Sequence, residues 1–167
     1  PVLKEDLGHY IDKYNIWSSY GVESEGVFIA YASVYGNTRK AADMLASKLA
    51  DKGVHVTVSD LARDDWAECL EDAFRYGKLV LAAPTYNADV FPAMKEFINH
   101  LTERNYQNRT IGIIENGSWA PMAAKVMKGM FEKSKNITFA ENTVTVRSAV
   151  NAANEAQIEA LAEELKG

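Results

Sequence analysis

The sequence predicts an α/β fold in which a doubly wound sheet of five parallel strands follows an extra N-terminal helix. From about residue 26 onward, short apolar runs alternate strictly with segments whose apolar residues recur every three or four positions. Such alternation is typical of a parallel sheet that helices cover on both faces. The length of 167 residues is that of one domain with a full core.

Each element has its own signal in the sequence. The predicted strands are residues 27–32, 54–59, 79–83, 110–115 and 143–147. The predicted helices are residues 38–52, 64–76, 92–104, 119–134 and 151–166. Two sets of apolar residues follow the helical spacing i, i+3, i+4, i+7: Met94, Phe97, Ile98 and Leu101, and Ile158, Leu161, Ala162 and Leu165. Gly53 fits the left-handed position that ends a helix, and Pro92 and Pro121 fit a first helical turn.

The first twenty residues lie outside this alternation. Their apolar residues predict one face of an amphipathic helix, formed by Leu3, Leu7, Tyr10, Ile11 and Tyr14. A doubly wound domain is complete without such a helix. Two interpretations therefore stay open, a decoration that packs on the sheet or the tail of a preceding domain.

Composition and charge exclude several classes of function. The chain is 47% hydrophobic and 25% charged, and it has no apolar run long enough to cross a bilayer. A formal net charge of −5 without a basic cluster argues against a nucleic-acid partner. The single cysteine, Cys69, excludes an internal disulfide, and His9, His55 and His100 lack the spacing of metal ligands. We expect a cytoplasmic location, although a chain that begins at Pro1 leaves a removed leader open.

The most informative segment is the turn at residues 33–38, which we call the phosphate loop. It follows the first predicted strand and leads into a helix, so backbone N–H groups and the positive helix end meet there. Such a site binds phosphate, and Ser33 and Thr38 add two hydroxyls beside Tyr35 and Asn37. The loop lacks the lysine of a P-loop and the spaced glycines of a dinucleotide site. A cofactor with one phosphate is therefore favoured.

Two further loops follow the third and fourth predicted strands and should meet the phosphate loop at one edge of the sheet. The first, residues 83–89, contains Pro84, Tyr86 and Asn87, and the second, residues 115–121, contains Trp119 after an Asn-Gly turn. Aromatic side chains in such loops would stack on a planar ring, which adds about 0.5–1.5 kcal/mol beyond area burial. A phosphate at one end and aromatic walls at the other describe flavin mononucleotide (FMN).

Three motifs in these loops match a known family. Ser33-Val-Tyr-Gly-Asn-Thr38, Pro84-Thr-Tyr-Asn87 and Asn116-Gly-Ser-Trp119 together resemble the flavodoxin-like domain of flavodiiron proteins, the A-type flavoproteins. The match covers essentially the whole chain and implies a flavodoxin-like strand order of 2-1-3-4-5. The N-terminal helix resembles the closing helix of the metallo-β-lactamase-like diiron domain that precedes the flavin domain there. The resemblance thus divides the chain into residues 1–22, the end of a preceding domain, and residues 23–167, the FMN-binding domain.

The resemblance also implies the cofactor-binding residues. The phosphate would be held by Ser33, Tyr35, Gly36, Asn37 and Thr38, with the backbone N–H of Val34. The ribityl chain and the ring would be bordered by Pro84, Thr85, Tyr86, Asn87 and Ala88, and closed over by Asn116, Gly117, Ser118 and Trp119. Arg39 and Lys40 depart from the family pattern. Helical spacing predicts that they point to solvent, and the alternative is that they strengthen phosphate binding. No catalytic side chain and no metal ligand is expected in this chain.

The function implied is electron transfer. In the family, electrons reach the flavin from a partner such as rubredoxin or a flavin/NADH reductase. They then pass to a diiron site in the same protein, which reduces dioxygen or nitric oxide, and the parent protein is a homodimer or homotetramer. One alternative is a free-standing flavodoxin or a quinone/FMN reductase, whose chain would start close to the first strand. Another is a response-regulator-like module without flavin, but the expected aspartates are absent after the first and third predicted strands.

Overall fold

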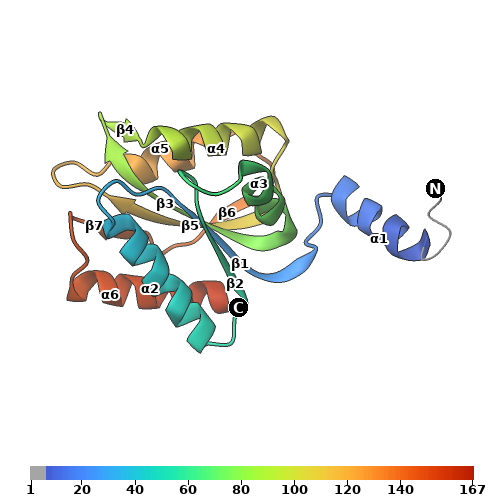
Figure 1. The fold of residues 1–167 in the computed structure, drawn as a ribbon, viewed down its shortest axis with the longest axis horizontal. Coiled ribbons are helices and arrows are strands. Elements are labelled where there is room, and N and C mark those ends of the chain that lie inside the picture. The colour runs from blue at the N-terminus through green and yellow to red at the C-terminus, as the bar shows by residue number, and fades with distance from the viewer. Residues whose placement is uncertain (1–6) are drawn as a thin grey trace.

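The computed structural model describes residues 7–167, and its centre is a mostly parallel sheet between two layers of helices (Figure 1). The strand order is β2-β1-β3-β5-β6, with β7 on the same edge as β6. The strands are β1 (Ser24–Tyr31), β2 (Val56–Asp60), β3 (Tyr76–Tyr86), β4 (Asp89–Val90), β5 (Arg109–Asn116), β6 (Ile137–Phe139) and β7 (Val144–Val146). All pairs are parallel except that of β4 with β3. The predicted α/β fold and the order 2-1-3-4-5 are confirmed.

The helices cover both faces of the sheet (Figure 1). On one face lie α2 (Asn37–Asp51) and α6 (Ala152–Lys166), and on the other lie α3 (Trp66–Arg75), α4 (Pro92–Glu103) and α5 (Ala123–Met130). Each face has its own core, because neighbouring residues of a strand point to opposite sides. In β1, Phe28 packs with α3 and α4, whereas Ile29 packs with α2 and α6, and both are fully buried. This two-sided burial explains why the central strands are continuous apolar runs.

The last edge of the sheet differs from the prediction of one strand at 143–147. It is divided between β6, which pairs with residues 109–111 of β5, and β7, which pairs with residues 114–116. Between them the backbone N–H groups of Glu141 and Asn142 donate to the Glu164 carboxylate, at 2.6 and 3.1 Å. These bonds to α6 replace ladder bonds to β5, so the chain leaves the sheet and returns to it.

Two other elements also differ. The helix predicted at 119–134 is shorter, since α5 spans Ala123–Met130 and the preceding residues form a loop. The antiparallel strand β4 was not predicted, because two residues are too few for a periodic pattern. Both differences lie beside the carboxyl edge of the sheet and shape the site described below.

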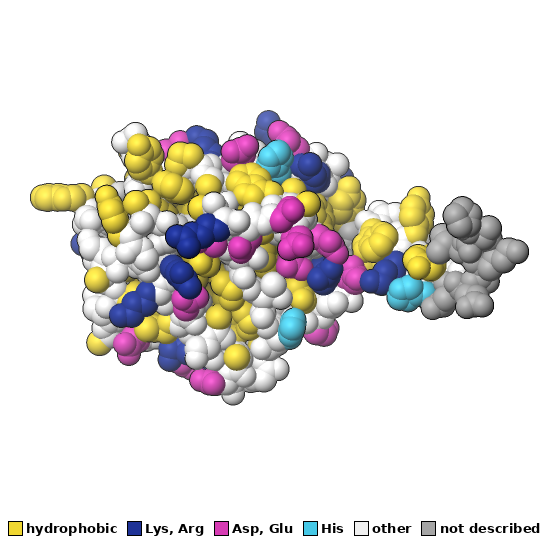
Figure 2. All heavy atoms as spheres, in the orientation of Figure 1, with side chains coloured by type: hydrophobic (Ala, Val, Ile, Leu, Met, Phe, Trp, Pro, Cys, Tyr) yellow, Lys and Arg dark blue, Asp and Glu magenta, His cyan; other side chains and the backbone are white. Residues whose placement is uncertain are grey.

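The N-terminal helix α1 (Leu7–Ser18) projects away from the sheet (Figure 1). It has no buried residue, and Leu7, Tyr10, Ile11, Tyr14 and Trp17 are each 49–67% exposed. Figure 2 shows apolar side chains along this helix. The interpretation as a decoration packed on the sheet is therefore wrong for residues 7–18, while Leu3 lies outside the described residues. Within residues 7–167, no helix is both long enough and apolar enough to cross a membrane.

Candidate cofactor-binding site

A cavity of about 360 Å³ lies at the carboxyl edge of the sheet, where the loops after β1, β3 and β5 meet. Its lining residues carry hydroxyl, amide, aromatic and aliphatic groups, and none of them is charged. They are Ser33, Val34, Tyr35, Asn37, Thr38, Pro84, Thr85, Tyr86, Phe91, Asn116, Gly117, Ser118 and Ser148. The three predicted loops therefore do converge on one space, and this space is the candidate site.

The phosphate loop has the geometry of an anion site. Gly36 adopts φ 88°, a left-handed conformation that favours glycine, and its N–H donates to the Ser33 hydroxyl at 3.0 Å. The helix α2 then begins at Asn37, and no side chain caps it. The N–H groups of its first turn thus keep their donor capacity at the positive end of the helix dipole. Thr38, in the first turn of α2, is only 2% exposed and lines the cavity.

The two cations that follow the loop do not belong to the site. Arg39 and Lys40 are exposed, and neither lines the cavity. The guanidinium of Arg39 pairs instead with the Asp43 carboxylate on the next turn of α2, at 3.5 Å. Their predicted orientation toward solvent is confirmed, and neutral donors are what the cavity offers to a phosphate.

The second loop is a tight hairpin turn between β3 and β4. Tyr86 pairs with Asp89, and the two residues between them, Asn87 and Ala88, have φ of 50° and 58°. Two consecutive left-handed residues are characteristic of the turn that matches the twist of an antiparallel pair. The Tyr86 ring meets the Phe91 ring edge to face, with centroids 6.1 Å apart. Phe91 also lines the cavity, although no sequence signal distinguished it from a core residue.

Ala88 makes this turn costly. A left-handed conformation costs a non-glycine residue about 1–2 kcal/mol, and Asn87 tolerates it better than alanine does. We expect Ala88→Gly to raise the free energy of unfolding by about 1 kcal/mol, measured by urea denaturation. Ala156→Gly, on the exposed face of α6, is the matched control and should lower it by about as much. If Ala88→Gly also lowered the free energy of unfolding, as Ala156→Gly should, Ala88 would not be strained.

Side chains of the neighbouring strands β3 and β5 fix the end of the third loop, residues 117–122. The Thr85 hydroxyl accepts hydrogen bonds from the N–H groups of Met122 and Ala123, at 3.0 and 3.2 Å. The buried Glu115 carboxylate accepts from the Ala124 N–H and the Thr145 hydroxyl, both at 2.9 Å. Residues of the neighbouring strands β3 and β5 thus supply the N-terminal cap of α5, a role usually taken by the residue that precedes a helix.

A fourth loop, residues 147–150, completes the wall, and the sequence analysis missed it. The Asn116 side chain donates to the Ser148 carbonyl at 3.2 Å and accepts from the Ser148 N–H at 3.1 Å. The hydroxyls of Ser118 and Ser148 are 2.8 Å apart. Ser148 has φ 69°, so its backbone is held in an unusual conformation beside the cavity. The Asn116 side chain thus joins the third and fourth loops, and it also lines the cavity.

Most of the predicted site residues line the cavity, but some do not. Gly36, Asn87, Ala88 and Trp119 are not among the lining residues. Gly36 and the hairpin turn act through their backbone geometry, as described above. Trp119 is 95% exposed, so in this conformation it is not a wall of the cavity. Tyr35 lines the cavity although its side chain is 92% exposed.

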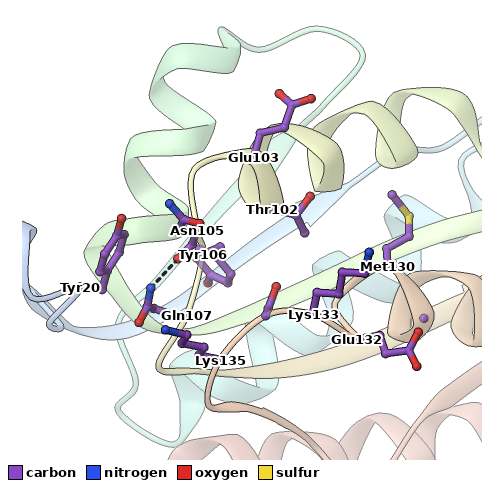
Figure 3. Close-up of a pocket in the computed structure, with 12 residues that line it drawn as sticks. Tyr20, Thr102, Glu103, Asn105, Tyr106, Gln107, Met130, Glu132, Lys133 and Lys135 are labelled. Atoms are coloured by element: carbon purple, nitrogen blue, oxygen red, sulfur yellow. Dashed lines mark hydrogen bonds between the residues drawn. The ribbon is translucent and has the colours of Figure 1, made fainter.

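A larger hollow of about 710 Å³ lies at the opposite edge of the sheet (Figure 3). It lies between the C-terminal ends of α4 and α5 and is lined by Glu103, Glu132, Lys133 and Lys135 among others. The C-terminal ends of helices carry partial negative charge, which disfavours a phosphate. The cavity at the carboxyl edge is therefore the better cofactor site.

The comparison with known sequences decides the family. The sequence model of the flavodoxin domain matches residues 28–151 of this chain, which include all four loops of the cavity. The chain belongs to the flavodoxin domain family. Flavodoxin domains bind FMN, so the cofactor expected from the loops is that of the family. This membership sets aside the response-regulator-like interpretation.

The chain is similar to domains of two kinds of known protein. The coenzyme F420H2 oxidase of Methanothermobacter marburgensis is 32% identical over 101 residues, which are 60% of this chain and 24% of the oxidase. The rubredoxin:oxygen oxidoreductase of Desulfovibrio gigas superposes with a TM-score of 0.87 and 19% identity over 95% of this chain and 39% of its own. A flavodoxin from the domain Archaea gives a TM-score of 0.73 and 15% identity over 84% of this chain and 96% of its own. The chain thus spans about a quarter of the curated oxidase it matches.

Proposed function

We propose that this chain is the FMN-binding electron-transfer domain of a flavodiiron protein. The observation that carries the proposal is the uncharged cavity at the carboxyl edge, with an uncapped helix N-terminus at one end and aromatic side chains along its rim. A phosphate and a planar ring are the two chemical groups that such a cavity accommodates. FMN carries both.

The residues would divide the work as follows. The Ser33 and Thr38 hydroxyls and the N–H groups of the first turn of α2 hold the phosphate, while Gly36 gives the loop its shape. Tyr86 and Phe91 exclude water from one side of the ring. The third and fourth loops, joined by Asn116, form the other side.

FMN, when bound, accepts and releases electrons one or two at a time, and the protein binds it, orients it and shields it. None of the described residues that line the cavity is charged, so they offer no carboxylate, imidazole or ammonium group for proton transfer, and the backbone would contribute hydrogen bonds only. Asn87 and Ala88 follow Tyr86, which lines the cavity, and left-handed residues at a hairpin tip leave backbone N–H and C=O groups without ladder bonds. We assign this turn the hydrogen bonds to the ring edge, where reduction adds a proton.

The wider proposal concerns the parent protein. Residues 1–22 would close a metallo-β-lactamase-like diiron domain, and residues 23–167 would form the flavin domain. The superposition on the oxidoreductase leaves about eight residues of this chain uncovered (5% of 167), fewer than the twelve residues of α1, so it extends into that helix. The superposition on the archaeal flavodoxin leaves 16% of this chain uncovered. This difference favours a flavodiiron parent over a free-standing flavodoxin or a quinone/FMN reductase.

In that parent, electrons would enter from rubredoxin or a flavin/NADH reductase and leave to the diiron site, which reduces dioxygen or nitric oxide. The parent would be a cytoplasmic homodimer or homotetramer, in which the flavin of one subunit faces the irons of another. The exposed apolar face of α1 supports the proposal that another domain packs on this helix. Five large apolar side chains exposed together are typical of a surface that a partner covers.

The direct test is a titration of the ligand-free chain with FMN, followed by flavin absorbance and fluorescence. We expect one FMN per chain and flavin bands that disappear on addition of dithionite. Riboflavin, which lacks the phosphate, should bind more weakly because it leaves the phosphate loop without a ligand. If neither the absorbance nor the fluorescence of FMN changes when the chain is present at saturating concentration, the proposal is overturned.

A further inference from the structure

Arg109 makes an unusual set of contacts at the edge of the sheet opposite the cavity. It is the first residue of β5 and is 3% exposed. Its guanidinium donates to five backbone carbonyls at 2.6–3.1 Å, those of Tyr20, Gly21, Phe74, Gln107 and Asn108. These acceptors come from the segment after α1, the end of α3 and the two residues before β5. One side chain therefore joins three segments that are far apart in the sequence.

Burying the charged guanidinium of Arg109 costs free energy, so stability alone does not explain this arrangement. Among the residues that the structure describes, no carboxylate forms a salt bridge with Arg109, and its Nε has no hydrogen-bond partner. Burial lowers the pKa of the guanidinium, which remains charged because an arginine pKa is so high. An apolar residue at such a site is often as stable as a buried charge. A planar group with five N–H donors, however, can hold several carbonyls in one fixed geometry.

Two of these carbonyls belong to the turn that ends α1. Tyr20 is left-handed with φ 54°, and the Gly21 N–H donates back to the Ile16 carbonyl at 2.8 Å, as in a helix C-terminal Schellman motif. The carbonyls of Tyr20 and Gly21 then accept from Arg109 at 2.7 and 2.9 Å. The end of α1 is thus bonded to β5 directly, with no flexible residue between the helix stop and the clamp.

A second set of contacts joins the body of α1 to the same place. The Glu23 carboxylate accepts from Lys13 and from the Trp17 indole N–H, the latter at 3.0 Å. The Glu23 N–H donates to the Arg75 carbonyl at 3.0 Å. The Tyr20 ring lies 6.5 Å from the Phe74 ring and borders the hollow drawn in Figure 3. The segment between α1 and β1 is therefore a joint with fixed contacts on both sides.

We propose that Arg109 is a positioning residue that fixes the direction in which α1 leaves the flavodoxin domain. Its guanidinium holds the carbonyls of Tyr20 and Gly21, so the segment between α1 and β1 forms a rigid joint. The joint itself follows from the contacts above and is independent of any cofactor. Its value for electron transfer rests on the proposed function: a rigid joint keeps the cavity at a constant distance and angle from whatever α1 belongs to.

The test measures the position of α1 directly. Spin labels at Gly8→Cys on α1 and Glu155→Cys on α6 report one distance across the joint, and the native Cys69 is fully buried and will not react. We expect a single narrow distance distribution in the otherwise native chain. Arg109→Met should broaden the distribution at least twofold, because methionine has no hydrogen-bond donor. Arg109→Lys should broaden it less, because an ammonium keeps three of the five donors of a guanidinium.

Lys78→Met is the matched control. Lys78 is a cation at the same edge of the sheet, and the side-chain hydrogen bond it donates goes to the Leu165 carbonyl of α6, at 2.8 Å. Its loss should leave the distribution narrow. FMN affinity, measured on the same samples, should be unchanged by Arg109→Lys, because Arg109 begins β5 and the cavity lies at its other end. FMN binding thus tests the proposed function separately from the joint.

A broad distribution in the otherwise native chain would overturn the proposal even if Arg109→Met failed to fold. A distribution that stays narrow in both Arg109 variants would overturn it as well, since other contacts would then hold α1. Equal broadening by Lys78→Met and Arg109→Met would show a general loss of stability and would also contradict a positioning role.

Discussion

Removing the two hydroxyls of the phosphate loop, with Ser33→Ala and Thr38→Ala combined, should weaken FMN binding by at least tenfold. A hydrogen bond to a charged group contributes about 1.5–3 kcal/mol, and a tenfold loss of affinity corresponds to about 1.4 kcal/mol. The Ser33 hydroxyl also accepts the Gly36 N–H, so its loss loosens the loop that presents the backbone donors. Isothermal titration calorimetry with FMN measures the effect.

Riboflavin makes this prediction specific to the phosphate. The double variant should bind riboflavin about as well as the native chain does, because the altered groups face a phosphate that riboflavin lacks. Ser18→Ala combined with Thr102→Ala removes two hydroxyls that are outside the cavity and should change neither affinity. Equal loss of FMN and riboflavin affinity in the Ser33 and Thr38 variant would mean that the phosphate binds elsewhere.

The centre of the fold was predictable from the sequence because two-sided burial leaves a strong pattern. Phe28 and Ile29 face opposite cores, so the run that contains them has no polar residue to blur its assignment. The helices α4 and α6 each bury the apolar face expected from spacing. The convergence of three loops at one edge followed from the parallel strand order alone.

What the sequence did not reveal depends on side-chain contacts between distant residues. Glu164 interrupts the edge strand from 22 residues away, and Ser148 joins the cavity through Asn116 from 32 residues away. In the sequence Arg109 simply precedes an apolar run, yet in the structure it is buried and holds five backbone carbonyls. No local pattern encodes such pairs, since hydrogen bonds between loops depend on the finished fold.

Trp119 shows the same limit from the other side. Its place in a strand-to-helix loop favoured a partner ring, and the structure leaves it 95% exposed beside the cavity. Large aromatic side chains are costly to expose, so this position is consistent with a surface that a bound ring or a neighbouring protein covers. Its role as a cover for the flavin stays a prediction.

Thr85 was assigned to the cofactor, and the structure gives its hydroxyl a second task that can be measured apart from it. Thr85→Val removes the acceptor of the Met122 and Ala123 N–H groups while keeping the shape of the side chain. A buried donor left without a partner costs about 1–3 kcal/mol, and Ala123 is fully buried. We therefore expect Thr85→Val to lower the free energy of unfolding by about 2 kcal/mol in urea denaturation of the ligand-free chain.

Thr85→Ser separates the hydroxyl from the methyl group. It keeps the oxygen that caps α5 and should retain most of the stability, whereas a packing role for the methyl group would make the serine variant as unstable as the valine variant. Amide hydrogen exchange at Met122 and Ala123 should speed up in Thr85→Val alone. Because residues 117 and 118 of the loop before α5 line the cavity, FMN affinity should fall with the same hydroxyl, even in a chain whose phosphate loop is intact. The Thr85 hydroxyl therefore shapes the site through the cap on α5, and Thr85 also lines the cavity itself.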